Sequence, residues 1–402
     1  MKKIGILFGQ ERTFPQAFVE RVNQKNVPGI VAEPVSIDKV IQGDTSDYAV
    51  IIDRISQDVP FYRAFLKNAA LSGTAVINNP FWWSADEKFF NNALMTKVGV
   101  PVPKTVLLPS KEHPTDTSSE SFSNLAFPLD WDGIFNYIGF PAYMKPFAGG
   151  GWKSVYRLEN ADDFFEKFEE TEQLVMMLQE EIQFESYFRC YCIGGKYVRI
   201  MHYEPRNPHH LRYQAHFDVS DEMMQKMHDI VLKINHSLGY DFNTVELAIR
   251  DGVPYAIDFC NPAPDADIHS VGQENFDWVV ETAATYAIER AQAHVEGQQN
   301  LTWGNFIRQA VGPVAVSNEE TSDQDTLLAK IGVVEEDQKD DLKKINGVGP
   351  KLEGMLNSMG IYTFAQLSRV GAKEYELIDS LLTGFKGRGK RDDWAGQAKK
   401  MI

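Results

Sequence analysis

A lysine followed closely by three glycines is the pattern in this chain with the most evident chemical use. Lys145 ends a short apolar run, Gly149, Gly150 and Gly151 follow, and a return strand is expected to begin near Ser154. Glycine tolerates positive φ and leaves backbone N–H groups uncovered, so such a hairpin can close over phosphate oxygens while the lysine adds a positive charge. Taken alone, the motif favours a simpler interpretation: a flexible glycine tip beside a surface lysine.

Oxygen-bearing side chains form a second pattern, on a predicted hairpin. Glu246 and Asp258 lie on its two strands and Asn261 follows three residues later. All three offer hard oxygen ligands, which suit Mg²⁺ bound by a few protein oxygens and nucleotide phosphates. The alternative is two ordinary polar strand residues and an asparagine that caps a turn at Pro262, and the spacing does not decide between the two.

Arg189 lies inside an aromatic strand, where it either meets an anion or extends its charged end to the surface. Gln179, Glu180, Glu181 and Ile182 follow another strand, so a backbone edge and a carboxylate could bind an adenine amino group there. A surface glutamate pair is the commoner arrangement. The loop 206–212 holds Arg206 and Arg212, which suit a carboxylate-rich substrate or simply face solvent.

The elements that must position these residues begin with an alternation of strands and helices, which predicts a parallel α/β layer over about the first 80 residues. Strands are expected at 3–8, 48–53 and 74–78, and helices at 13–24 and 62–71. A further helix is expected from Ser84 to about Gly99, with Asp86, Glu87 and Lys88 in its first turn.

The rest of the body is predicted to contain two hairpins and several helices. The first hairpin pairs 187–193 with 196–202 across Gly194 and Gly195, and the second pairs 243–249 with 254–258. A strand is expected at 173–178, and helices before Gly139 and at 162–170, 220–238 and 276–295.

Composition narrows the class of protein. The 402 residues carry a net charge of −16, which argues against bulk attraction to nucleic acid or anionic membranes. The three cysteines, Cys190, Cys192 and Cys260, match neither a zinc spacing nor a disulfide framework. No window is apolar enough to span a membrane and the N-terminus lacks a signal-peptide pattern, so we expect a cytoplasmic protein.

The C-terminal part differs in composition. Residues 317–342 hold nine acidic residues and two lysines, which predicts a solvated, partly disordered linker. After it, residues 345–356 resemble a helix–hairpin–helix motif, whose glycine N–H groups can meet a phosphate. Six Lys or Arg and two Asp follow Thr383. The module resembles accessory domains of ribosomal and respiratory subunits, which favours protein docking over nucleic-acid binding and leaves both open.

In their order along the chain, the motifs of residues 1–300 resemble the ATP-grasp superfamily. The resemblance is closest to its ligases of the ribosomal-protein glutamylating and glutathione synthetase type. It depends on 76–80, 86–88, 99–105, 143–151, 179–182 and 188–194, and on Glu246 with 258–261. It implies an α/β (α+β) body, divided into a pre-ATP-grasp domain (1–83), a central subdomain (84–178) and a C-terminal subdomain (179–312). An acidic linker (313–340) and a small all-α helix–hairpin–helix domain (341–402) complete the chain.

The resemblance also implies roles for individual residues. Lys88 and Lys145 would bind ATP phosphates beneath the loop Gly149–Gly151, and Gln179, Glu180, Glu181 and Ile182 would hold adenine. Arg189 and Lys145 would be catalytic. Glu246, Asp258 and Asn261 would hold Mg²⁺, with Mn²⁺ as an alternative. The family usually has one residue between the second carboxylate and the asparagine, whereas Phe259 and Cys260 intervene here. Either a bulge re-aims Asn261, or Asp265 and Asp267 replace it.

The implied activity is an ATP-dependent ligase that joins a carboxylate to an amine or thiol through an acyl phosphate. Its substrates would be small molecules or peptides. Two alternatives stay open: a non-catalytic ATP-binding scaffold, and a nucleic-acid-associated protein whose function resides in the C-terminal module.

Overall fold

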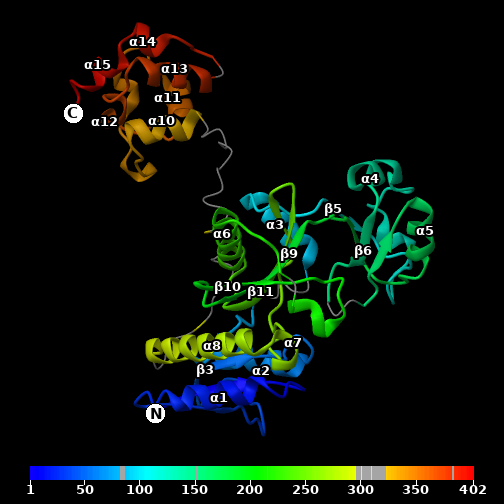
Figure 1. The fold of residues 1–402 in the computed structure, drawn as a ribbon. Coiled ribbons are helices and arrows are strands. Elements are labelled where there is room, and N and C mark those ends of the chain that lie inside the picture. Colours follow the sequence, from blue (N-terminus) through cyan, green and yellow to red (C-terminus); the bar gives the residue numbers. More distant parts are fainter. Residues whose placement is uncertain are drawn as a thin grey trace. The chain divides into compact units, whose positions relative to one another are not determined.

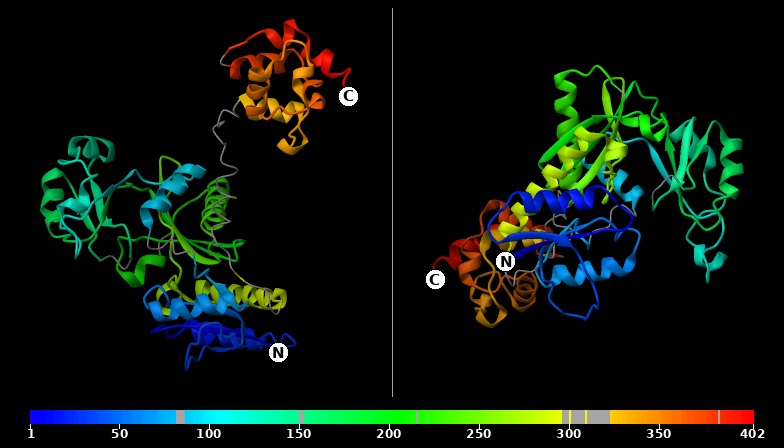
Figure 2. Two further views of the ribbon diagram at one scale, coloured as in Figure 1. Left: turned by 180° about the vertical axis from the view of Figure 1, so that it is seen from behind. Right: turned by 60° about the horizontal axis from the view of Figure 1, so that its bottom comes forward.

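The computed structural model describes residues 1–81, 87–149, 153–214, 216–295, 300, 309, 323–382 and 384–402. The chain divides into two compact units, Met1–Gly312 and Pro313–Ile402. The first unit contains three four-stranded sheets and the second is helical. Figures 1 and 2 show the helices and strands of each unit.

The N-terminal sheet is wholly parallel, as predicted, in the order β2 (Ile30–Pro34), β1 (Lys2–Leu7), β3 (Tyr48–Asp53), β4 (Ala75–Ile77). Alternate residues face opposite sides of the sheet. Ile4 and Ile6 pack with α1 (Phe14–Gln24) and α8 (Gln273–Ala293), and Leu7 and Ile51 pack with α2 (Pro60–Leu71). Figure 1 shows the late helix α8 beside this early sheet. The chain therefore returns to its first domain after building the other two sheets.

The second sheet is antiparallel, in the order β5 (Thr105–Leu108), β8 (Met176–Glu180), β6 (Ala142–Pro146), β7 (Tyr156–Leu158). Helices α4 (Trp131–Ile138) and α5 (Ala161–Glu169) cover one face, where Met144 joins a core with Phe164. The short helix η2 (Ser119–Phe122) lies in the preceding connection. Because side chains alternate along a strand, Lys145 faces away from this core.

The third sheet is also antiparallel, in the order β10 (Tyr197–His202), β9 (Ser186–Ile193), β11 (Phe242–Arg250), β12 (Val253–Asp258). The predicted hairpin between β9 and β10 is present, but its loop has three residues rather than two. Gly194 and Gly195 both have a φ of 63°, and Ile193 pairs with Tyr197, so Lys196 also belongs to the loop. Helix α6 (Asp221–Leu238) packs on one face, and η3 (His209–Gln214) and α7 (Ile268–Val271) complete this part.

One asparagine joins the N-terminal sheet to the third sheet. Asn78, directly after β4, donates through Nδ2 to the backbone oxygens of Phe242 (2.7 Å) and Pro262 (3.0 Å). Its Oδ1 accepts from the backbone N–H groups of Asp241 (2.8 Å) and Phe242 (2.7 Å). A single side chain therefore holds the start of β11 and the loop after β12.

The structure corrects several predicted boundaries and adds two strands, β2 and β5. The strand predicted at 173–178 is β8, which extends to Glu180, so Gln179 and Glu180 lie in the strand rather than after it. Helix α3 runs over Lys88–Val98 rather than from Ser84, because Glu87 has a non-helical φ of −132° and ψ of 57°. Ser84 and Asp86 lie outside the described residues. Strand β7 begins at Tyr156, since Ser154 has a φ of +54° that a strand does not accommodate. Strand β2 was not predicted, and its five residues include a proline.

The second unit is built from short helices around one apolar core, in which Trp394 is fully buried. The helices are α10 (Asp323–Ile331), η4 (Glu336–Gln338), η5 (Leu342–Lys344), α11 (Pro350–Ser358), α12 (Phe364–Leu367), α13 (Ala372–Leu381), α14 (Arg388–Arg391) and α15 (Trp394–Ala398). Leu327 and Ile331 of α10 are also fully buried in this core. The prediction that the whole acidic segment is a linker is therefore wrong for α10, because apolar residues at helical spacing outweigh its charges.

Candidate active site

Three neighbouring strands bring an arginine and two carboxylates to one face of the third sheet. Glu246 on β11 is paired with Arg189 on β9 and with Asp258 on β12. Side chains of directly paired residues project from the same face. The pairing shifts by one residue after Glu246, so Ile257 is an extra residue in β12. This bulge aligns Asp258 with Glu246, since an unbroken ladder would place Ile257 there.

Strand β9 separates this face from the core. Phe188, Cys190 and Cys192 are buried against α6, whereas Tyr187 and Arg189 lie on the opposite face. The Tyr187 hydroxyl donates to Glu246 Oε2 at 2.6 Å. Tyr187 was not among the predicted site residues, although its two-residue spacing from Arg189 places both on one face.

Arg189 and Glu246 share a largely enclosed environment, with side chains 13% and 18% exposed. Arg189 Nε lies 3.7 Å from Glu246 Oε1, and Nη1 donates to the Tyr213 hydroxyl at 3.1 Å. Burial raises the pKa of Glu246, while the nearby Arg189 charge acts in the opposite direction. The arrangement holds a cationic group beside a carboxylate without a close ion pair.

The two predicted lysines lie near these carboxylates. Burial lowers the pKa of Lys145 to about 8; the charge of Asp258 opposes this shift, Lys88 adds to it, and Glu246 opposes it. The backbone N–H of Lys88, at the start of α3, donates to the carbonyl of Phe147 just beyond β6 at 2.9 Å. Charges from α3, β11 and β12 therefore act on Lys145.

Asn261 lies beside β11, with its side-chain nitrogen already engaged. Its backbone N–H donates to Asn243 Oδ1 (2.8 Å), and its Nδ2 donates to the carbonyl of Thr244 (3.1 Å). The remaining side-chain oxygen is the atom type that a hard cation prefers, so Glu246, Asp258 and Asn261 fit Mg²⁺ by donor chemistry. Across the described parts of the chain, no three His, Cys, Asp or Glu side chains are grouped to hold a metal.

Asp265 and Asp267, the alternative metal ligands, already have partners in their own loop, in α7 and at Thr13 before α1. Asp265 accepts from the Ser270 hydroxyl and from the backbone N–H of Asp267. Asp267 accepts from the Thr13 hydroxyl at 3.0 Å and from the backbone N–H of His269 at 2.9 Å. Both carboxylates are thereby fixed in orientation.

The segment predicted to hold adenine forms the end of β8 and the start of the connection to the third sheet. Gln179 is buried and donates to the Thr105 hydroxyl at 2.8 Å. Glu180 lies 3.6 Å from Arg250 Nη2, and Glu181 accepts from Arg157 Nη2 at 2.7 Å. Ile182 is buried in a small aromatic cluster. The four residues are therefore adjacent to both sheets, and the side chains of Gln179 and Glu181 already have partners.

The glycine loop is described only in part. Gly149 is exposed with a φ of +84°, and a side chain there would have open space but an unfavourable backbone conformation. Gly150 and Gly151 lie outside the described residues. In the cationic loop, Arg212 donates to the Tyr203 hydroxyl at 3.3 Å, whereas Arg206 is paired with Glu204 at 2.5 Å. Only Arg212 of these two lines a pocket with Arg189.

Comparison with known proteins identifies the second unit at sequence level. The family model "RS2/RL21/YNQ2 HHH domain" matches residues 342–402. Large ribosomal subunit protein bL21 of Jannaschia sp. (strain CCS1) is 56% identical over 59 residues, 15% of this chain and 22% of that protein. Small ribosomal subunit protein uS2 of Methylobacterium nodulans is 40% identical over 63 residues, 16% of this chain and 18% of that protein. The chain thus spans about a fifth of the length of these two relatives.

Solved structures resemble the first unit. A RimK domain protein ATP-grasp from Sphaerobacter thermophilus matches with a TM-score of 0.52 and 15% identity, over 71% of this chain and 99% of that one. VanG D-Ala:D-Ser ligase from Enterococcus faecalis matches with a TM-score of 0.51 and 13% identity, over 72% of this chain and 99% of that one. The first unit therefore has the ATP-grasp fold, and the second is a helix–hairpin–helix domain. Within the described residues, no helix is long and apolar enough to cross a bilayer.

Proposed function

Starting from the ATP-grasp fold, we propose that the chain is an ATP-dependent ligase that joins a carboxylate to an amine or a thiol. One observation carries the proposal, the grouping of positive and oxygen-bearing side chains. The charges of Asp258, Lys88 and Glu246 act on Lys145, and Glu246 pairs across strands with Arg189 and Asp258. Such a combination of side chains can bind a polyphosphate and its cation. In this arrangement the positive groups would neutralise the phosphates and the oxygen ligands would hold the metal.

The reaction follows from these groups. A substrate carboxylate oxygen attacks the γ-phosphorus of ATP, the bond to the β-phosphate bridging oxygen breaks, and ADP leaves. The acyl phosphate then receives the nitrogen or sulfur nucleophile at its carbonyl carbon, and inorganic phosphate leaves. Lys145 and Lys88 would neutralise phosphate charge, and Arg189 would stabilise the transferring phosphoryl group. Mg²⁺ or Mn²⁺, held by Glu246, Asp258 and Asn261, would supply further charge neutralisation at the phosphates.

Adenine would lie at the connection between the second and third sheets. Glu180 and the backbone at Ile182 are proposed to contact the base, and Gly149, Gly150 and Gly151 to close over the phosphates. Gln179 would contribute through the backbone of its strand and not through its side chain, because the side chain is buried against Thr105. The side-chain oxygen of Asn261 favours an intact metal site over the scaffold alternative.

The test is phosphate release from MgATP by the full chain, with pools of amino acids, small peptides and dicarboxylates. We expect one pool to stimulate release by wild type and not by Asp258→Ala, whose oxygen ligand is missing. Asp229→Ala, which removes an exposed carboxylate on α6, is the matched control and should behave like wild type. ATP binding without stimulation by any pool would favour the non-catalytic scaffold.

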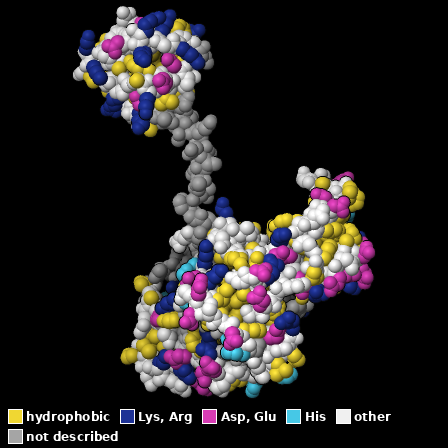
Figure 3. All heavy atoms as spheres, turned by 45° about the horizontal axis from the view of Figure 1, so that its top comes forward, with side chains coloured by type: hydrophobic (Ala, Val, Ile, Leu, Met, Phe, Trp, Pro, Cys, Tyr) yellow, Lys and Arg dark blue, Asp and Glu magenta, His cyan; other side chains and the backbone are white. Residues whose placement is uncertain are grey.

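We further propose that the helix–hairpin–helix domain docks the ligase onto a ribosomal partner, with protein rather than nucleic acid as the contact. In this domain Phe385 has Lys351 and Arg388 over its ring, at 5.8 and 4.9 Å from the ring centroid. Figure 3 shows Lys and Arg side chains on the surface of the domain. The named ribosomal relatives support this choice of partner.

Co-sedimentation of the full chain with ribosomes tests the docking proposal. The double variant Lys351→Glu/Arg388→Glu should sediment less, whereas Lys373→Glu, an exposed charge reversal on α13, should sediment like wild type. Competition by added RNA at equal efficiency for any sequence would instead support nucleic-acid binding. Equal sedimentation of all three proteins would contradict a role for this surface.

A further inference from the structure

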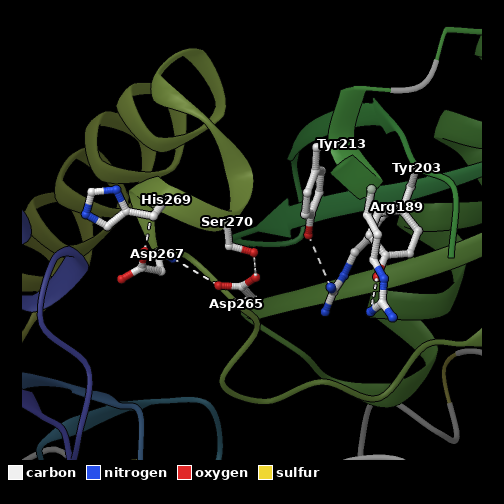
Figure 4. A pocket seen from close by; sticks show the side chains of 8 residues that line it. Arg189, Tyr203, Tyr213, Asp265, Asp267, His269 and Ser270 are labelled. Atoms are coloured by element: carbon white, nitrogen blue, oxygen red, sulfur yellow. Dashed lines mark hydrogen bonds between the residues drawn. The ribbon is translucent and has the colours of Figure 1, made fainter. Parts of the chain in front are cut away.

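A pocket of about 350 Å³ opens beside Arg189. Its lining comes from five parts of the first unit: β9, the residue after β10, η3, the loop leading into α7, and α7 itself. The lining residues are Arg189, Tyr203, Arg212, Tyr213, Asp265, Asp267, His269 and Ser270. In Figure 4, the side chains of Asp265 and Asp267 lie on one side, and Arg189 with the tyrosines lies on the other.

Tyrosine hydroxyls orient the cationic side of the pocket. Arg189 Nη1 donates to Tyr213 at 3.1 Å, and Arg212 Nη1 donates to Tyr203 at 3.3 Å. Tyrosine is neutral at ordinary pH, and burial raises the pKa of Tyr213 further. The two guanidinium groups are therefore held in place without neutralisation by these partners. Arg189 Nε is buried and has no hydrogen-bond partner among the described residues.

Hydroxyl and backbone N–H groups orient the anionic side. The Ser270 hydroxyl and the Asp267 N–H hold Asp265, and the Thr13 hydroxyl and the His269 N–H hold Asp267. These neutral donors leave each carboxylate with lone pairs for a further donor, since a carboxylate has about four acceptor positions.

Charges of opposite sign thus face one another across the pocket without pairing. Within the described part of the chain, neither Arg189 nor Arg212 forms an ion pair within 4.0 Å of Asp265 or Asp267. A ligand that carries both charges would complete each side. A pocket of this size, with few oriented polar groups, suits a small molecule.

We propose that this pocket binds a free α-amino acid, which is the carboxylate donor of the ligase reaction. Its carboxylate faces Arg189 and Arg212, and its ammonium group faces Asp265 and Asp267. The inference rests on the proposed ligase function. The amino acid is the donor rather than the acceptor because an ammonium group held by two carboxylates is protonated and not nucleophilic. Its carboxylate lies on the side of Arg189, the residue adjacent to the carboxylate pair Glu246 and Asp258.

Hydroxylamine allows the donor to be tested without knowledge of the acceptor. Its nitrogen attacks the acyl carbon of an acyl phosphate, phosphate leaves, and a coloured iron hydroxamate reports the product. The full chain is incubated with MgATP, hydroxylamine and each of the common amino acids, in parallel with the carboxylic acid that lacks the amino group. We expect hydroxamate from at least one amino acid and at least 10-fold less from its deaminated counterpart, because charged hydrogen bonds to the ammonium are lost.

Asp265→Asn is the informative variant. Its amide oxygen can still accept from the Asp267 N–H, and its amide nitrogen can donate to the Ser270 hydroxyl oxygen, so the loop is kept. We expect its KM for the amino acid to rise roughly 10- to 100-fold, with the KM for ATP unchanged. Asp229→Asn makes the same chemical change at an exposed position of α6 and should leave both constants unaltered. Asp267→Asn gives a second, independent measure of the anionic side.

The outcomes separate this inference from the function on which it rests. Equal hydroxamate from amino acids and deaminated acids, or no specific effect of Asp265→Asn, would overturn the amino-acid pocket and leave the ligase intact. If no acid yields hydroxamate, calorimetric titration of the amino acids into the chain with Mg²⁺ and a non-hydrolysable ATP analogue decides. Binding that Asp265→Asn weakens would support the pocket while the ligase function fails, and no binding would overturn the pocket.

Discussion

Asn78 offers the most direct test of how the N-terminal sheet is joined to the active-site sheet. Replacement by alanine removes four hydrogen bonds, two donated by Nδ2 and two accepted by Oδ1. A hydrogen bond contributes about 1 kcal/mol net, and water can replace part of this at a half-buried position. We therefore expect Asn78→Ala to lower the free energy of unfolding of the first unit by about 2–4 kcal/mol, against a usual total of about 5–15 kcal/mol.

Asn23 provides a matched control within the same domain. Its side chain also bridges backbone groups, but it makes two hydrogen bonds, both with Ala32, at 3.0 and 2.8 Å. Asn23→Ala should therefore cost about 1–2 kcal/mol. The ratio between the two losses tests the structural account more strictly than either value.

The measurement is urea unfolding of the full chain, followed by tryptophan fluorescence, with wild type and both alanine variants at equal concentration. Asn78→Asp adds a discriminating case. It keeps an oxygen for the N–H groups of Asp241 and Phe242, but it places a second oxygen against the carbonyls of Phe242 and Pro262, so it should be at least as destabilising as alanine. A loss for Asn78→Ala no larger than that for Asn23→Ala would refute the reasoning.

Three further predictions address the site and the second unit. Lys145→Met should lower MgATP-dependent phosphate release by roughly 100-fold or more, measured as initial rates, because a positive group at the phosphates is lost; unchanged rates would exclude Lys145 from the site. Asn261→Ala should raise the Mg²⁺ concentration for half-maximal activity by roughly 10-fold, because one oxygen ligand of the metal is lost. Asn23→Ala, the control, should leave this concentration unchanged. Leu327→Ala should lower the free energy of unfolding of the helix–hairpin–helix domain by about 2–5 kcal/mol, seen by calorimetry as a shift of one transition, because the side chain is fully buried.

Local chemistry was sufficient to predict much of the third sheet. Gly194 and Gly195 between two apolar runs specify a tight hairpin, and the turn at residues 250–253 specifies the next one. The turn alone would pair Glu246 with Ile257, so it places Asp258 next to Glu246 but does not specify their pairing. The grouping of Arg189 with these acids depends on the order of the strands in the sheet, which the local sequence does not specify.

Other features depended on contacts between distant segments. The bulge at Ile257 has no glycine or proline to announce it, and it decides which face Asp258 occupies. Helix α10 was hidden by a high density of acidic residues, although Leu327 and Ile331 have helical spacing. Gln179 was predicted at the nucleotide, but its side chain bonds Thr105, 74 positions earlier. The proposed amino-acid pocket joins segments that no local pattern connects.

The two faces of β9 have a consequence for how the chain tolerates change. The odd-numbered Tyr187 and Arg189 lie toward the site, and the even-numbered Phe188, Cys190 and Cys192 are packed against α6. Each set has its own requirement, so neutral substitutions along this strand must preserve the side-chain chemistry on the site face and the side-chain volume on the core face. In a library of single substitutions, positions that give well-folded but inactive proteins would alternate along the strand with positions that give poorly folded proteins. This one strand would therefore report selection for activity and selection for stability.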